Sequence, residues 1–102
     1  MKAWELIQST GWCQGDYATA DSFSDVAPDS ERATCFCIMG ALMRCYGTGS
    51  YAYTQAVEKA AACLPSSVPV LGISAGARLV RWNDMKGRTK QDVVQLLQEA
   101  GV

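Results

Sequence analysis

The stretch from Ala33 to Tyr46, which reads ATCFCIMGALMRCY, constrains the fold of this chain more than any other segment. Nine of its fourteen residues are large or sulfur-bearing apolar types, and Arg44 carries its only charge. A helix that is apolar on nearly every side is expected where other elements cover it all round. The stretch therefore predicts a central buried helix over residues 33–46, with the rest of the protein packed around it.

Length, composition and charge indicate the class of protein. The chain has 102 residues, 49% of them hydrophobic, and a net charge of −1, which predicts one folded domain over residues 1–102. Its apolar runs fall short of the roughly 18 residues that a membrane span needs. Glu5 and Gln8 interrupt the apolar centre that a signal peptide would have. Five cysteines, three of them in the apolar stretch, suit free thiols in a reducing compartment, so we expect a cytoplasmic protein without membrane contact.

Three further segments, residues 2–9, 51–63 and 90–100, have the spacing of apolar side chains that is typical of amphipathic helices. Thr89 and Asp92 form a capping-box pattern at the start of the last one. The fold class that these signals predict is mainly α, with about four helices packed round the central buried helix (33–46) and a minor short β element.

The ends of the predicted helices carry recognisable cap residues. Asp29 or Ser30 can accept hydrogen bonds from the first turn of the central helix, and Gly47 suits its end. Ser50 can cap the helix over residues 51–63 in the same way, and Gly101 suits the end of the last helix.

Short extended segments are expected at three places. A very short strand is predicted near Tyr17–Thr19, and the β-branched residues of Val68–Ile73 favour a second extended segment. Ala77–Trp82 suits either a helical turn or a second strand, and we favour a strand that runs into Trp82. The turn-forming residues Asn83 and Asp84 follow it.

Gly72–Gly76 matches the G-x-S-x-G pattern of a nucleophile elbow, in which a sharp turn presents the serine. The serine needs a base to remove its proton, and the chain contains no histidine. We therefore interpret the pattern as a turn of small residues. A small enzyme that pairs a Cys or Ser nucleophile with an Asp or Lys partner stays an alternative hypothesis.

The cysteines and aspartates invite a metal-site interpretation. Cys35 and Cys37, placed on a helix, would point about 200° apart and could not bind one ion together. The acidic string Asp16, Asp21, Asp25, Asp29, Glu31 lacks the alternating ligands and central glycine of a calcium loop, and we interpret it as a solvated loop whose aspartates cap turns. We therefore expect neither a metal site nor a cofactor.

Basic residues cluster around Trp82-Asn83-Asp84. Arg81, Arg88 and the start of the last helix at Thr89 could bind a phosphate or an acidic partner surface. A charged surface around a structural turn explains the same residues. The pI of about 5.2 argues against nucleic-acid binding.

Three pieces of the sequence together resemble a family of small bacterial and phage proteins known as a domain of unknown function. These pieces are the motifs GWCQG (11–15), CIMGAL (37–42) and Trp82-Asn83-Asp84 followed by Arg88-Thr89. The resemblance implies that the polar residues Gln14, Asn83 and Asp84 matter, and it implies no established activity. It also draws attention to Gly40-Ala41, where small side chains would let the loop of Trp12 or Trp82 pack closely on the helix.

The leading hypothesis for function is a non-enzymatic cytoplasmic binding protein, and the resemblance makes a phage gene one of two candidate sources. Its partner would be a host protein or a small anionic, phosphorylated ligand. A structural subunit that forms homo-oligomers, with Trp4, Tyr51 and Tyr53 at the contact, is a further alternative. The expected binding residues come from the two tryptophan-containing segments: Trp12, Gln14, Arg81, Trp82, Asn83, Asp84, Arg88 and Thr89.

Overall fold

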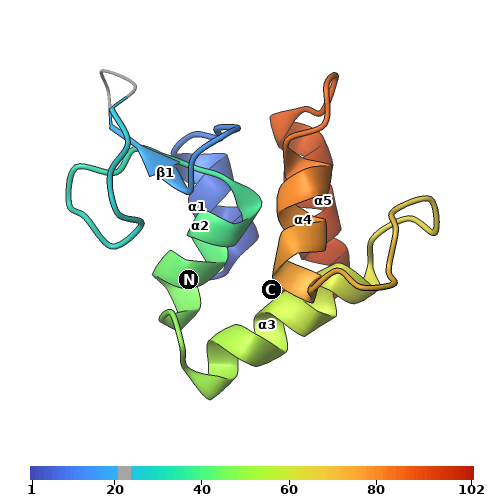
Figure 1. The fold of residues 1–102 in the computed structure, drawn as a ribbon. Coiled ribbons are helices and arrows are strands. Elements are labelled where there is room, and N and C mark those ends of the chain that lie inside the picture. Colours follow the sequence, from blue (N-terminus) through green and yellow to red (C-terminus); the bar gives the residue numbers. More distant parts are fainter. Residues whose placement is uncertain (21–23) are drawn as a thin grey trace.

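A computed structural model describes residues 1–20 and 24–102 of the chain (Figure 1). Within these residues it has five helices and one antiparallel pair of two-residue strands, which confirms the predicted mainly α fold. The elements are α1 (Ala3–Ser9), β1 (Ala18–Thr19), β2 (Cys35–Phe36), α2 (Ile38–Tyr46), α3 (Tyr51–Ala62), α4 (Ala75–Asn83) and α5 (Lys90–Ala100). No helix in this part of the chain is long and apolar enough to cross a membrane.

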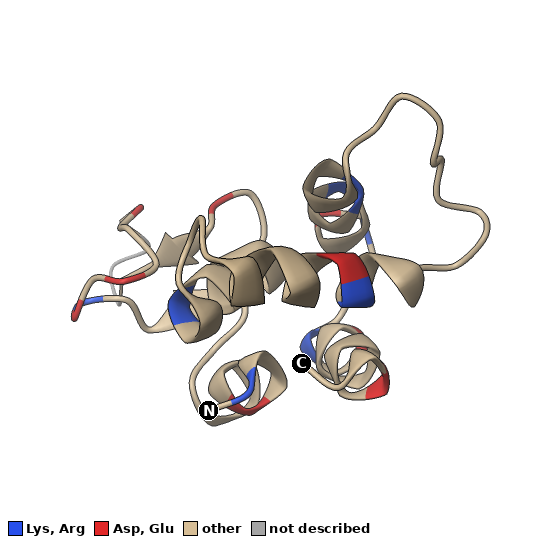
Figure 2. Ribbon diagram, turned by 90° about the horizontal axis from the view of Figure 1, so that it is seen from below, with Lys and Arg blue, Asp and Glu red and all other residues tan. Residues whose placement is uncertain are grey.

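The two ends of the chain lie side by side because α1 packs against α5 (Figures 1 and 2). The Ala3 N–H donates to the Val102 carbonyl at 2.6 Å, and Lys2 Nζ donates to the Gly101 carbonyl at 2.7 Å. Viewed from below, α3 lies across the lower ends of α4 and α5 (Figure 2). Helix α2 completes the bundle by packing on α1, α3 and α4.

The central helix is shorter than the sequence predicts, because α2 begins at Ile38. Asp29 and Ser30 therefore do not cap it, and the cap is Cys37, whose Sγ accepts from the Gly40 N–H at 3.3 Å. Buried residues fill its first half, from Ile38 to Leu42, whereas Arg44 in its last turn is exposed. A central helix is confirmed, but the start at residue 33 is wrong.

The segment over residues 33–37 is extended because its backbone groups form hydrogen bonds with other loops and do not form the bonds of a helix. In the pair of strands Ala18 lies opposite Phe36 and Thr19 opposite Cys35. The Phe36 N–H donates to the Gly11 carbonyl at 2.9 Å, and the Cys37 N–H donates to the Tyr17 carbonyl at 3.0 Å. These long-range bonds hold the segment extended, which its β-branched and aromatic residues also favour.

The prediction of a strand at Ala77–Trp82 is wrong, since these residues belong to helix α4. Ser74 caps this helix by accepting from the Ala77 N–H at 3.2 Å. Leu79, Trp82 and Asn83 recur at helical spacing and form its buried face. The alternation that a strand would need is absent from these positions.

The extended segment predicted at Val68–Ile73 is also wrong. The described structure has turns there, with the Val68 N–H bonded to the Pro65 carbonyl at 3.0 Å. Val68 packs into the core, but Val70 is 62% exposed and Leu71 is 96% exposed, so the segment as a whole is not the buried extended chain that the prediction assumed.

The remaining local predictions are confirmed within about one residue at each end. They comprise the helices predicted at 2–9, 51–63 and 90–100, the short strand near Tyr17–Thr19, the Ser50 cap and the Thr89–Asp92 capping box. Gly47 and Gly101 end their helices with φ angles of 82° and 75°, which favour glycine.

Gly40 allows the backbone of the first loop to contact α2 directly. A Cβ placed at Gly40 would overlap the Tyr17 carbonyl, which is backbone and has little room to move. The close approach that we predicted for Gly40 is thereby confirmed, and the loop that makes it follows Trp12.

We predict that Gly40→Ala lowers the free energy of unfolding by about 2–3 kcal/mol, because the new methyl group must displace the Tyr17 backbone. Gly76→Ala is the matched control, since its Cβ would meet the flexible end of the Met39 side chain at 3.3 Å. That variant gains the higher helix propensity of alanine and should unfold at the wild-type urea concentration or above it. Equal urea midpoints for the two variants would contradict the close packing at Gly40.

Candidate functional site

The side chain of Asn83, the last residue of α4, is fully buried and has hydrogen bonds to two distant segments and to the neighbouring Asp84. Its Oδ1 accepts from Trp12 Nε1 at 2.8 Å and from the Ile38 N–H at 2.9 Å. Its Nδ2 donates to the Cys13 carbonyl at 3.2 Å and to Asp84 Oδ1 at 2.9 Å. One amide group thus joins the first loop, the start of α2 and the end of α4.

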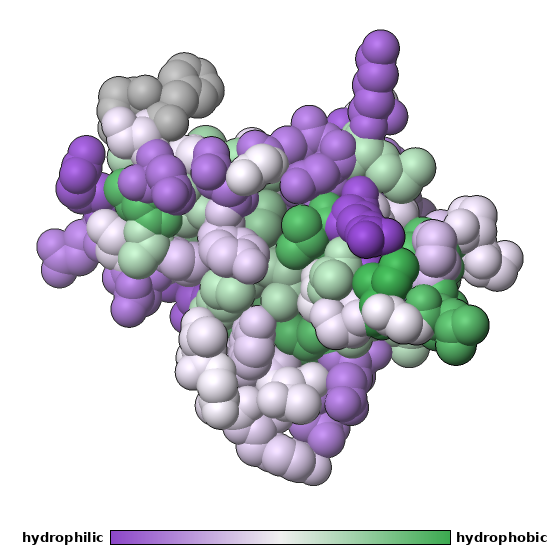
Figure 3. Space-filling view, viewed as in Figure 1, coloured by the Kyte–Doolittle hydropathy of each residue, from purple (hydrophilic) through white to green (hydrophobic). Residues whose placement is uncertain are grey.

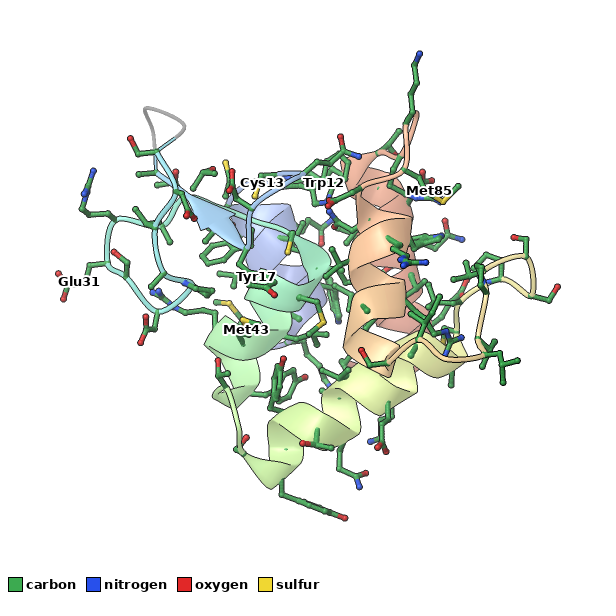
Figure 4. All side chains as sticks on the ribbon, viewed as in Figure 1. Trp12, Cys13, Tyr17, Glu31, Met43 and Met85 are labelled. Carbon is green, nitrogen blue, oxygen red and sulfur yellow. The ribbon has the colours of Figure 1, made fainter. Side chains whose placement is uncertain are left out.

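Gln14 and Asp84 extend this connection toward the surface. Gln14 Nε2 donates to the carbonyls of Asn83 and Met85, at 2.9 and 3.1 Å. Asp84 Oδ1 accepts from the Gly15 N–H at 3.1 Å. Carbonyl groups at the end of a helix need partners from outside it, and here Gln14 provides one. We call Trp12, Gln14, Asn83 and Asp84 the Asn83 cluster; Trp12 and Met85 are labelled near it in Figure 4.

The structure brings these four sequence-predicted residues together, although they are about 70 positions apart in the chain. The polar atoms of Asn83 are occupied by protein groups, so its amide serves to hold the loop on α4. Asp84 differs, because it is exposed and lines a pocket. The cluster is therefore the support of a candidate site, and Asp84 is its member that lines the pocket.

The other predicted residues lie on a different side of α4. The Arg88 guanidinium lies 4.1 Å from the centroid of the Trp82 ring, and Arg88 Nε donates to the Trp82 carbonyl at 2.9 Å. Trp82 is only 5% exposed beneath it. Thr89 caps α5 and is engaged in that role. Arg81, by contrast, is exposed.

A pocket of about 360 Å³ opens beside the Asn83 cluster, between the first loops and α4. Its volume lies at the small end of the range for ligand pockets. Tyr17 lies over α2, at the edge of the pocket (Figure 4). The lining residues are Gly15, Asp16, Tyr17, Asp25, Cys37, Val80 and Asp84.

Some of the residues that line this pocket stand out in the amino-acid sequence, and others do not. Asp16 and Asp25 stand out in the acidic string, but we interpreted that string as caps of loop turns. Cys37 and Val80 give no local signal, because only the packing of β2 and α4 brings them here. Asp21, another member of the string, lies outside the described residues.

Two thiols near the pocket are poor nucleophiles. Burial, reinforced by the neighbouring Cys37, raises the pKa of Cys13 to about 12. Burial likewise raises the pKa of Cys37 to about 11, against the opposing effect of the Gly40 N–H bond. Because the thiolate is the reactive form, these pKa values argue against a catalytic cysteine at either position.

The structure also changes the argument about metal binding by cysteine. Cys35 and Cys37 lie in an extended segment, where alternate residues share a face, and not on the helix that we assumed. Even so, residues 1–20 and 24–102 contain no group of three His, Cys, Asp or Glu side chains placed to hold a metal ion.

Ser74 of the G-x-S-x-G pattern has a structural role, since its Oγ caps α4. The second glycine, Gly76, lies within α4 and faces the Met39 side chain of α2. The pattern therefore marks the turn of small residues that we predicted, at the entrance to a helix.

We predict that Asn83→Asp destabilises the protein by about 3 kcal/mol or more. The substitution removes the donor to the Cys13 carbonyl and places a buried charge against Asp84. Gln14→Met is the matched control: it removes only the outer hydrogen bonds and should cost about 1 kcal/mol. Urea unfolding followed by tryptophan fluorescence measures both values, and similar losses for the two variants would contradict the central position of Asn83.

Neither a curated protein nor a solved structure matches the chain. A protein family does match, over residues 1–101, which is nearly the whole chain. This match confirms the resemblance to a domain of unknown function that the motifs at Trp12, Gly40 and Trp82 indicate. The chain belongs to DUF6197, a family of unknown function.

Proposed function

We propose that this chain is a non-enzymatic binding protein and that the pocket beside the Asn83 cluster accepts a positively charged group of its ligand. One observation carries the proposal: the charged side chains that line the pocket, among the described residues, are the carboxylates of Asp16, Asp25 and Asp84. An ammonium or guanidinium group is attracted by such a lining, whereas a phosphate group is repelled.

The rest of the lining suits an organic cation. The Tyr17 side chain is 49% exposed and presents an aromatic ring, which attracts cations through its π face. Val80 and Cys37 supply apolar surface for an aliphatic chain. A ligand that combines a short hydrocarbon with a positive end would use both kinds of contact.

The pocket is preformed, which lowers the entropic cost of binding. Asp84 is held by the Gly15 N–H and the Asn83 amide, so one carboxylate has a fixed position. The Tyr17 backbone is held on Gly40 through the bond from the Cys37 N–H. The Asp84 carboxylate and the Tyr17 backbone are thus both held in place by hydrogen bonds.

The setting that we propose for this binding protein is the cytoplasm. All five cysteines are free, which suits a reducing compartment. A phage gene as its source and a host protein as its target stay predictions. The raised pKa values of Cys13 and Cys37, and the absence of histidine from the sequence, favour binding over the alternative of a Cys or Ser nucleophile.

The proposal is tested by titrating the isotope-labelled chain with butylammonium and butylguanidinium, using butanol and inorganic phosphate as the neutral and anionic controls. The amide resonances of Gly15, Asp16, Tyr17 and Val80 should shift with the two cations. Replacing Asp16 and Asp25 by Asn should weaken cation binding by about tenfold or more, since each carboxylate contributes on the order of 1 kcal/mol.

A second pair of substitutions, Asp29→Asn with Glu31→Gln, is the matched control. It removes the same charge from exposed loop residues that do not line this pocket, and cation binding should stay as in the wild type. Equal affinity for butanol and butylammonium, shifts at other residues, or phosphate binding in this pocket would each overturn the proposal.

A further inference from the structure

A second hollow, of about 230 Å³, lies on another side of α4 and shares no lining residue with the first pocket. It is formed where the loop after α3 returns past the end of α4. Its described lining residues are Ser67, Val68, Pro69, Arg81, Trp82 and Met85.

Large apolar side chains are exposed around this hollow. Leu71 is 96% exposed and Val70 62%, and both follow directly on the lining residues of the loop. Met85, on the opposite edge, is 50% exposed. Figure 3 shows hydrophobic residues gathered over this loop, at the right of the view. Grouped apolar exposure of this kind is typical of an interaction site, whereas isolated apolar side chains need no explanation.

The charge beside the hollow is positive. Arg81 is the charged residue in the described lining, and Lys86 is exposed next to Met85. Arg78 lies one turn before Arg81 on α4 and adds a further positive charge beside it.

The floor of the hollow is rigid. Trp82 is nearly buried under the Arg88 guanidinium, and Arg88 Nη2 lies 3.3 Å from Met85 Sδ. This stacking fixes both the indole ring and the methionine that edges the hollow. A partner side chain that enters the hollow therefore meets a surface that is already ordered.

We propose that this face, which we call the α4 docking surface (Val70, Leu71, Arg78, Arg81 and Met85), binds an acidic protein segment. The segment places a large apolar side chain in the hollow, against Trp82, and sets Asp or Glu residues against Arg81 and Arg78. The proposal rests on charge complementarity and on the grouped apolar exposure, and it does not depend on the cation pocket.

The test begins with random peptides displayed on phage particles and selected on the full chain. The selected peptides should combine Trp, Phe or Leu with neighbouring Asp or Glu residues. A synthetic copy of one selected peptide is then measured by fluorescence anisotropy against the wild-type chain. Binding should weaken as the salt concentration rises, because the ion pairs lie at the surface.

The substitutions Arg81→Glu and Leu71→Ser should each lower the affinity for that peptide by about tenfold or more. Both residues are exposed, so circular dichroism should show an unchanged fold. Arg32→Glu is the control, because it makes the same change in charge at an exposed residue outside the α4 docking surface. This variant should bind the peptide as the wild type does. A peptide with Lys in place of its acidic residues should regain affinity for the Arg81→Glu variant.

Three outcomes would overturn the proposal. The first is selection of peptides that are not enriched in acidic residues, or of none at all. The second is binding that neither Arg81→Glu nor Leu71→Ser changes. The third is a concentration-dependent dimer in sedimentation experiments that Leu71→Ser abolishes, because the surface would then be an interface between two copies of this chain.

Discussion

The buried amide of Asn83 is the interaction on which the arrangement of this protein depends. It accepts from the Trp12 indole and the Ile38 N–H and donates to the Cys13 carbonyl and Asp84. A buried amide is costly unless its donors and acceptors are satisfied, so these segments must meet in one geometry. The same bonds end α4, start α2 and position the loop that borders the pocket.

Helix α4 then carries two surfaces of opposite chemistry. On the side of Val80 and Asp84 it borders a pocket lined by carboxylates, and on the side of Arg81 and Met85 it borders a basic and apolar hollow. Each surface has its own support: the Asn83 cluster for the pocket, and the stacking of Arg88 on Trp82 for the hollow. Under our two proposals, a cationic ligand group would bind on one side of α4 and an acidic protein segment on the other.

The helices with strong local caps were predictable except for α4, whereas the start of α2, which depends on long-range bonds, was not. The capping box of Thr89 sets the start of α5 from adjacent residues alone, whereas the extended conformation before α2 depends on the distant carbonyl of Gly11. The sequence pointed to Asn83 and Asp84 as important positions. It could not show that the amide of Asn83 is turned inward while Asp84 faces a pocket, because that distinction depends on how the first loop packs on Gly40.

Hydrogen exchange at the Trp12 indole N–H and the Ile38 amide tests the central claim most directly. If both groups donate to Asn83, both should exchange with a protection close to the free energy of global unfolding, because opening either bond exposes a buried amide. Exchange of both protons at the rate of exposed groups, in a chain that is otherwise folded, would show that Asn83 does not join the first loop to the helices.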